Sequence, residues 1–168
     1  MAIRQRCAPK GMIQRKSIGT AIATTRLENL CARAEHCESE LAEKLRRWGI
    51  GASESAEIIS GLRKHRFVDN ARFARAFVRD KYRFARWGRM KIRMALAAKR
   101  ISKEIVDEAL EEIDEDIYTE NLRHIIAAKA RSLGEETSSY EGRTKIYRFA
   151  ISRGYESSLI SKILKSGQ

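Results

Sequence analysis

LAEKLRRWGI (41–50), IRMALAAKRI (92–101) and IYRFAISRGY (146–155) are three stretches of one 168-residue chain that share a pattern and decide its fold. In each stretch an apolar residue stands nine positions, and an apolar or small residue five positions, before the final residue. The position just before the final residue is glycine in two stretches, Gly49 and Gly154. Glycine there is typical of a helix that ends in the left-handed conformation. The pattern therefore predicts three helices with a common ending.

Arg100 stands in the second stretch where the other two have glycine. An arginine in the left-handed conformation costs about 1–2 kcal/mol. Either this helix ends differently, or the chain tolerates the strain.

Each stretch is flanked by further helical patterns. Amphipathic segments follow it, SESAEIISGLRK (53–64), SKEIVDEALEEI (102–113) and ESSLISKIL (156–164), with Ser53 and Ser102 as expected N-caps. A further helix fits before each stretch, at roughly 26–36, 69–86 and 115–133. We therefore expect an all-α protein of three tandem three-helix repeats that form an elongated, curved stack. The expected division is a basic tail at 1–24, which we predict to be disordered, and repeats at 25–68, 69–114 and 115–168.

Composition restricts the class of protein. A single proline and an abundance of helix-forming residues argue against a sheet. The chain has no apolar run long enough to span a membrane and no secretory signal, so we expect no membrane association. Three cysteines, Cys7, Cys31 and Cys37, form no disulfide-scaffold spacing. They indicate free thiols and a cytoplasmic protein.

Charge is distributed unevenly along the chain, whose formal net charge is +12. Residues 67–103 hold twelve lysines and arginines against two aspartates, and residues 104–120 hold nine carboxylates and no cation. A block of positive charge attracts polyanions or acidic proteins. The acidic stretch has two interpretations: a solvated helix face between core positions, or a clamp on the neighbouring basic block or on a basic partner.

The basic block predicts a binding face. On a helical wheel of 100° per residue, five arginines fall within an arc of about 80°, and the phenylalanines Phe73, Phe77 and Phe84 lie on another side as expected core. Guanidinium groups at this density suit phosphate or carboxylate. The candidate DNA- or partner-binding residues are Arg72, Arg75, Arg79, Arg83 and Arg86 on this helix, and Arg89, Lys91, Arg93, Lys99 and Arg100 on the next.

The common catalytic and metal-binding signatures are missing, among them the P-loop, HExxH, GxSxG and paired CxxC. We therefore expect no catalytic residue, no metal, no cofactor and no enzymatic activity.

Residues 65–102, HRFVDNARFARAFVRDKYRFARWGRMKIRMALAAKRIS, resemble the second repeat of the RecX family of recombination regulators. The matching positions are Phe67, Val68, Asp69, Arg72, Phe73, Ala74, Phe77, Val78, Ile92, Leu96, Lys99 and Ile101. The wider resemblance covers about residues 27–166. Arg100 replaces the family's usual glycine, and the third repeat matches weakly.

The resemblance implies a small α-helical protein that lies in the groove of the RecA filament. It implies a monomer that inhibits RecA's ATP hydrolysis, strand exchange and coprotease activity, and so modulates recombination, DNA repair and the SOS response. The partners it implies are RecA and the phosphates of single- and double-stranded DNA.

Two other hypotheses remain open. A stand-alone, sequence-independent nucleic-acid-binding protein would use the same arginines without RecA. A nuclease would need a carboxylate metal site, for which Asp107, Glu108, Glu111 and Asp114 are the candidates.

Overall fold

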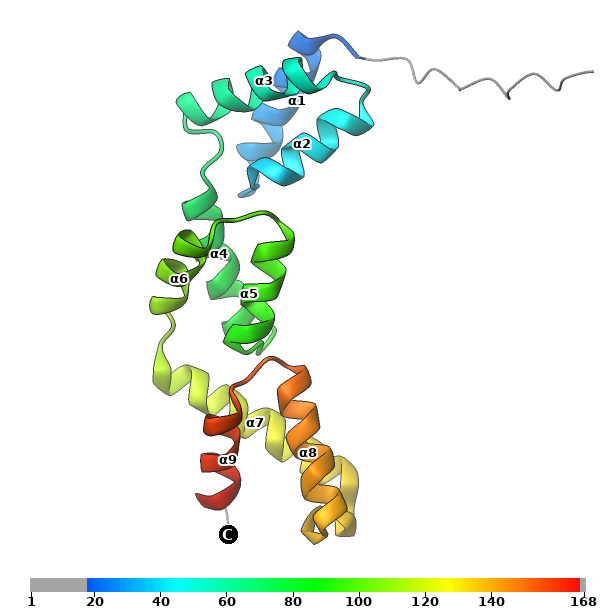
Figure 1. The fold of residues 1–168 in the computed structure, drawn as a ribbon, viewed down its shortest axis with the longest axis vertical. Helices are drawn as coiled ribbons and strands as arrows, with labels where there is room; N and C mark the ends of the chain where they lie inside the picture. Colours follow the sequence, from blue (N-terminus) through cyan, green and yellow to red (C-terminus); the bar gives the residue numbers. More distant parts are fainter. Residues whose placement is uncertain (1–17, 167–168) are drawn as a thin grey trace, which may run out of the picture.

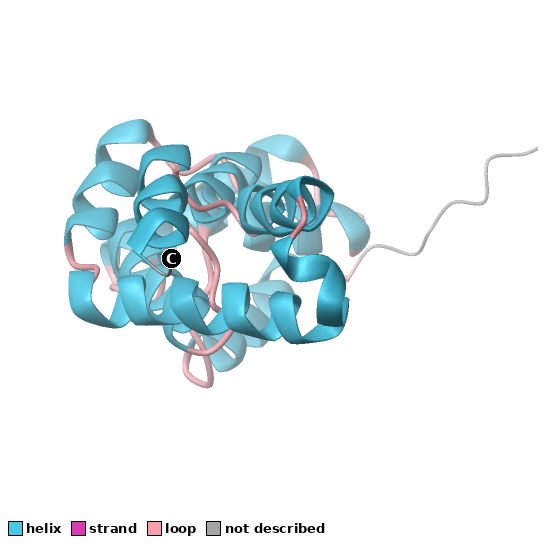
Figure 2. Ribbon diagram, turned by 90° about the horizontal axis from the view of Figure 1, so that it is seen from below, coloured by secondary structure: helices cyan, strands magenta, loops and turns pink. Residues whose placement is uncertain are grey.

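The computed structural model describes residues 18–166, which form helices, turns and loops without a β-strand (Figure 2). The all-α prediction is therefore confirmed. The elements are α1 (Thr20–Cys31), α2 (Glu38–Arg47), α3 (Ala52–Lys64), α4 (Asn70–Arg83), α5 (Arg89–Ala98), α6 (Lys103–Glu111), α7 (Glu115–Leu133), the 3-10 helix η1 (Gly134–Ser138), α8 (Tyr140–Ser152) and α9 (Ser157–Ser166). None of these helices is long and apolar enough to cross a membrane.

The helices form three modules of three, stacked along the long axis of the molecule (Figure 1). We call α1–α3 module 1, α4–α6 module 2 and α7–α9 module 3. In the view of Figure 1, α5 and α8 lie to the right of α6 and α9, and α3 crosses the top of the stack. Modules 2 and 3 therefore place their equivalent helices on the same sides.

The common helix ending is confirmed in all three modules. The residue before the final apolar position has a positive φ each time: 79° at Gly49, 59° at Arg100 and 90° at Gly154. The following backbone N–H donates to the carbonyl five residues earlier, as in Ile50 to Leu45 at 3.1 Å and Ile101 to Leu96 at 3.2 Å. This bond satisfies a carbonyl that the helix end leaves free. Arg100 thus adopts the glycine conformation, and the second helix does not end differently.

Two apolar cores hold the stack together. Module 1 has its own core, built around Leu27, Leu41, Leu45 and Leu62. Modules 2 and 3 share one continuous core, because side chains from α4 to α9 form a single buried cluster. Cys37 is the residue of module 1 that joins this larger cluster. The two C-terminal modules are therefore one packing unit.

Modules 1 and 2 meet mainly through polar contacts. Asn70 Oδ1 accepts a hydrogen bond from the backbone N–H of Glu38 at 3.0 Å, and Ser39 Oγ donates to the carbonyl of Lys99 at 2.6 Å. Lys99 also pairs with Glu40. We call this set of contacts the first joint.

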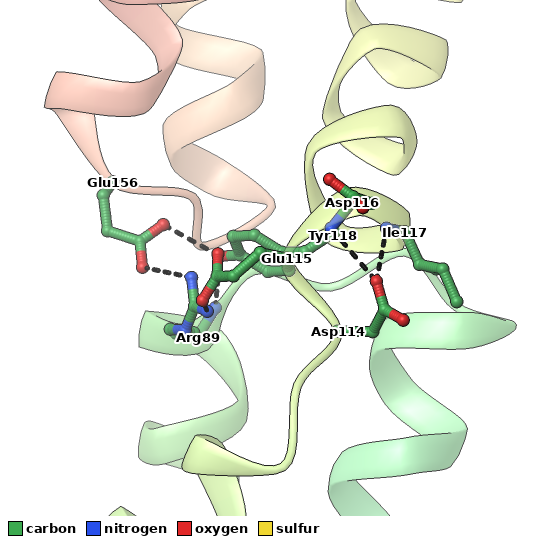
Figure 3. A network of polar contacts seen from close by, with 7 residues as sticks. All are labelled: Arg89, Asp114, Glu115, Asp116, Ile117, Tyr118 and Glu156. Atoms are coloured by element: carbon green, nitrogen blue, oxygen red, sulfur yellow. Dashed lines mark hydrogen bonds and ion pairs between the residues drawn. The ribbon is translucent and has the colours of Figure 1, made fainter.

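Modules 2 and 3 meet at a closer joint, drawn in Figure 3. The buried hydroxyl of Tyr118 accepts from the backbone N–H of Arg89 at 2.9 Å and donates to Glu156 Oε2 at 2.8 Å. The rings of Tyr118 and Tyr155 lie 4.9 Å apart. The backbones approach closely, since the N–H of Gly88 donates to the carbonyl of Arg153 at 2.8 Å. We call this the second joint.

Two local predictions differ from the structure. α1 begins at Thr20, so residues 20–24 of the expected tail are helical, and the rest of that tail, 1–17, lies outside the described residues. Ser102 caps α6 as predicted, but Ser53 lies inside α3, which begins after Gly51. The backbone N–H of Gly51, just before the helix, donates a hydrogen bond to Glu54 Oε2 at 3.2 Å.

Candidate nucleic-acid and partner interface

Helix α4 is amphipathic as predicted, but it is shorter than the sequence pattern suggests. Phe73, Ala74, Val78 and Tyr82 are buried against α6 and α7. The helix ends at Arg83, so the wheel does not apply to the residues beyond it. Phe84 is therefore 82% exposed, and its assignment to the core is wrong.

Arg86 is not on the helix face either. It lies in the loop between α4 and α5 with a φ of 51°, and its side chain is exposed. The predicted stripe of five arginines on one helix is therefore wrong at its C-terminal end and reduces to four.

Acidic side chains neutralise two of these four arginines. Arg72 Nε lies 2.6 Å from Glu35 Oε1, and Arg75 Nε lies 3.8 Å from Glu112 Oε1. Arg72 also donates to the carbonyl of Phe67 at 3.4 Å. Arg72 therefore has fewer donors left for phosphate, and Glu112 partly neutralises the charge of Arg75. These two residues are poorer candidates than the sequence suggested.

The cations of α5 are paired as well. Arg89 is only 22% exposed: its guanidinium lies 4.2 Å from the centre of the Tyr118 ring and contacts Glu115 and Glu156. Burial lowers the pKa of Arg89, but the surrounding groups outweigh it and raise the pKa above its ordinary value. Arg89 therefore stabilises the second joint. Arg93 pairs with Asp107, and Lys99 pairs with Glu40.

Five of the ten predicted residues form no ion pair with a carboxylate among residues 18–166. They are Arg79, Arg83, Arg86, Lys91 and Arg100. Arg83 donates to the hydroxyl of its neighbour Tyr82 at 2.9 Å, and Lys91 lies over the Trp87 ring at 4.4 Å. These five remain the candidate contacts to an anionic partner.

Aromatic rings and lysines alternate between α4 and α5. The rings of Phe73, Phe77 and Trp87 follow one another at 5.8 and 6.5 Å. Lys81 Nζ lies 5.1 Å from the Phe77 ring centre and 5.3 Å from that of Trp87. We call this set, completed by Lys91 and Lys99, the lysine–aromatic row. Lys99 is paired with Glu40, so Lys81 and Lys91 are the cations of the row that suit a phosphate backbone.

Sequence reasoning missed Lys81 and Trp87. The four-residue spacing of Phe77 and Lys81 on a helix was a usable signal for the first. Nothing local predicted Trp87, because its neighbours come from a different helix.

The acidic stretch contacts the basic block. Glu112 pairs with Arg75, Glu115 with Arg89, and Asp107 with both Arg93 and Lys103. Hydrogen bonds from Lys103 and Arg93 hold the pKa of Asp107 below its ordinary value. The interpretation as a clamp within the molecule is therefore the better one.

The same pairing weakens the nuclease hypothesis, since Asp107 is occupied. Among residues 18–166 no group of three or more His, Cys, Asp and Glu side chains is arranged to hold a metal ion.

Comparisons with known proteins agree with this architecture. Residues 69–110 match the model of the RecX second three-helix domain, and residues 115–164 match that of the RecX third three-helix domain. Together these two matches cover more than half of the chain. The chain belongs to the RecX family. The two matched segments correspond to modules 2 and 3, which share one core.

Individual RecX proteins support the assignment. The regulatory protein RecX of Clostridium botulinum (strain Alaska E43) is 31% identical over 129 residues, which are 76% of this chain and 60% of that protein. RecX of Ralstonia nicotianae is 25% identical over 134 residues, 80% of each chain. The chain thus spans about 60% of the length of the clostridial relative.

A solved structure shows the same fold. The crystal structure of RecX from Lactobacillus salivarius aligns with a TM-score of 0.76 at 20% identity, over 88% of this chain and 95% of that chain.

Proposed function

We propose that this RecX-family chain binds the RecA filament on DNA and inhibits its ATPase, strand-exchange and coprotease activities, and so modulates recombination and DNA repair. In this proposal the protein acts in the cytoplasm as a monomer and carries out no chemistry of its own. Its partners are RecA and the phosphates of single- and double-stranded DNA.

The observation that carries the proposal is an elongated RecX-type stack with unneutralised cations gathered on module 2. An extended stack can follow a helical filament over several subunits, whereas a compact domain would contact one. Arg79, Arg83, Arg86, Lys91 and Arg100, with Lys81, supply the positive charge. Their partner is either DNA phosphate or the acidic surface of RecA, because guanidinium and ammonium groups bind both.

The experiment is RecA's ATP hydrolysis on single-stranded DNA, titrated with the intact protein and with an Arg79→Ala, Lys81→Ala, Lys91→Ala variant at two salt concentrations. We expect the intact protein to inhibit at substoichiometric amounts, and the variant to need at least tenfold more protein. Each lost phosphate contact should also flatten the salt dependence.

The matched control removes three exposed cations from module 3, by Arg131→Ala, Arg148→Ala and Lys162→Ala. The net charge falls equally, so this control should inhibit like the intact protein. Equal loss in both variants would show that bulk charge is responsible. Full inhibition by the module 2 variant would exclude the proposed face.

The stand-alone nucleic-acid-binding protein remains the second candidate, because the +12 charge attracts DNA with or without RecA. Binding to naked DNA with no effect on RecA's ATP hydrolysis would replace the proposed function by this one.

A further inference from the structure

Module 1 lies outside the segments that match the RecX domain models, and it carries a pocket of its own. The pocket lies between α1 and the end of α2 and has a volume of about 380 Å³. Ligand sites have volumes of about 300–1,000 Å³, so it has room for one small group. Its lining residues are Arg26, Asn29, Leu30, Arg33 and Trp48.

The pocket has positive charge that nothing in the described chain neutralises. Arg26 and Arg33 are exposed, and neither has an ion pair with a carboxylate of residues 18–166. No aspartate or glutamate lines the pocket. Other arginines of this region are paired: Arg46 and Arg47 both contact Glu43, at 2.7 and 2.9 Å. The pocket therefore attracts an anion.

Trp48 gives the pocket a fixed aromatic surface. Its ring packs against the core of module 1, while part of it remains accessible to the pocket. Its backbone N–H donates to the carbonyl of Lys44 at 3.0 Å, and the next residue, Gly49, has a φ of 79°. Arg26 Cζ lies over the ring at 5.8 Å from its centre. The ring thus has a guanidinium group next to it.

This combination matches the chemistry of an unpaired nucleotide. Proteins that bind single strands stack bases on aromatic rings and track the phosphates with arginine. Amide side chains can bond the edge of an unstacked base, which a duplex keeps paired. Asn29 is exposed in the pocket and supplies such an amide.

We propose that this pocket binds one nucleotide of single-stranded DNA, with the base stacked on Trp48 and the phosphate held by Arg26 and Arg33. Asn29 contacts the edge of the base. The site extends the proposed function, because it gives module 1 a contact to the displaced or bound single strand that does not depend on RecA.

The test uses the fluorescence of Trp48 with no RecA present. The chain has two tryptophans, so Trp87→Phe leaves Trp48 as the only one and keeps an aromatic ring at position 87. We expect a ten-nucleotide oligo(dT) to quench Trp48 saturably, and a duplex of equal length to quench it at least fivefold less. If Trp87→Phe does not fold, 5-fluorotryptophan NMR of the intact chain gives one signal for each tryptophan, and Trp48→Phe identifies the signal of Trp48.

Two further variants in the same background separate the pocket from general charge. Arg26→Ala with Arg33→Ala should weaken oligo(dT) binding about tenfold or more. Arg46→Ala with Arg47→Ala removes the same amount of charge, but from residues that Glu43 already pairs. This pair of substitutions should change the affinity for oligo(dT) less than twofold.

Equal quenching by duplex and single strand, or equal effects of the two variant pairs, would overturn the proposal. Quenching by poly-glutamate but not by oligo(dT) would overturn it too and point to an acidic protein segment. Because RecA is absent, a failure here leaves the ATPase inhibition untouched, and loss of that inhibition leaves this result untouched.

Discussion

Among residues 18–166, three arginines adopt the left-handed backbone conformation that glycine usually takes. Arg66, Arg86 and Arg100 have φ values of 59°, 51° and 59°. Each follows the last turn of a helix, and at Arg66 the next residue, Phe67, donates to the carbonyl of Leu62 at 2.9 Å. At Arg66 and Arg100 the bond from the following residue satisfies a carbonyl at the helix end, which offsets part of the strain of the arginine.

Arg100→Gly should therefore stabilise the protein while it removes a cation. Relief of the left-handed strain, less the extra entropy of glycine in the unfolded chain, leaves a gain of up to about 1 kcal/mol. Chemical denaturation measures the free energy of unfolding. The comparison variant is Arg100→Ala, which loses the same guanidinium but keeps the strain, and should show no gain. Equal stability of the two variants would contradict the account.

Gly88→Ala should destabilise the second joint. An added Cβ at Gly88 would lie 2.1 Å from the backbone carbonyl of Gly154, which cannot move without shifting α8. Overpacking of this kind costs about 1–3 kcal/mol. Thermal unfolding should show a lower Tm. At Gly61, inside α3, an added Cβ meets no atom within 4 Å, so Gly61→Ala should raise Tm slightly. A Gly88→Ala protein as stable as the parent would refute the close approach.

At the scale of elements, two tyrosines should make the contact between α7 and the α8–α9 turn less stable at alkaline pH. Tyr118 and Tyr155 are buried, and burial is the main cause that raises the pKa of both phenols above the ordinary value. The neutral form is thus favoured in the folded state, while the unfolded chain releases the proton near pH 10. Stability is fully present below that pH and is lost as the pH rises above it.

We expect each of these tyrosines to lower the free energy of unfolding by about 1.4 kcal/mol per pH unit above pH 10. Urea unfolding between pH 9 and 11 measures the slope, and Tyr155→Phe should reduce it by one tyrosine's share. Tyr140 is 80% exposed, so Tyr140→Phe should leave the slope unchanged. The same slope in all three proteins would show that the buried phenol of Tyr155 does not contribute.

At the scale of the whole molecule, the two joints differ in strength. The second joint lies within a continuous apolar core, whereas the first depends on hydrogen bonds and ion pairs between modules 1 and 2. Partly exposed ion pairs stabilise little and are screened by salt. Module 1 should therefore open before the rest of the stack does.

Glu40 provides the test of this order. It pairs with Lys99 and lies 3.0 Å from His36 Nδ1. Burial raises the pKa of its carboxyl, but the hydrogen bonds from Lys99 and His36 outweigh it, so the pKa lies below the ordinary value. The contribution of Glu40 is therefore present above about pH 4.5 and is lost as the pH falls through the lowered pKa.

We expect Glu40→Gln to speed amide hydrogen exchange in α2 and α3 severalfold at neutral pH and to leave α8 unchanged. The parent should approach the variant as the pH falls below 4. Exchange that rises equally in α8 would show that the chain opens as one unit.

The sequence by itself determined the repeat, the helix endings and much of the helix pattern. Gly49 and Gly154 act on the backbone next to them, and helix propensity is local too, which explains why the predicted helix at 115–133 coincides with α7. The sequence left open whether the helix before Arg100 ends in the same way, and the structure shows that it does: Arg100 has a φ of 59°, and Ile101 bonds the carbonyl of Leu96 in that helix.

Only the tertiary structure decided which cations remain available to a partner. The carboxylates that neutralise Arg72, Lys99 and Arg89 come from positions 37, 59 and 67 residues away, so no wheel or charge count could assign them. The same holds for the exposure of Phe84, since α4 ends where the chain must turn to pair α5 with module 3. The sequence gives only the total charge of a segment, whereas binding depends on the charged side chains that folding leaves without an ion pair.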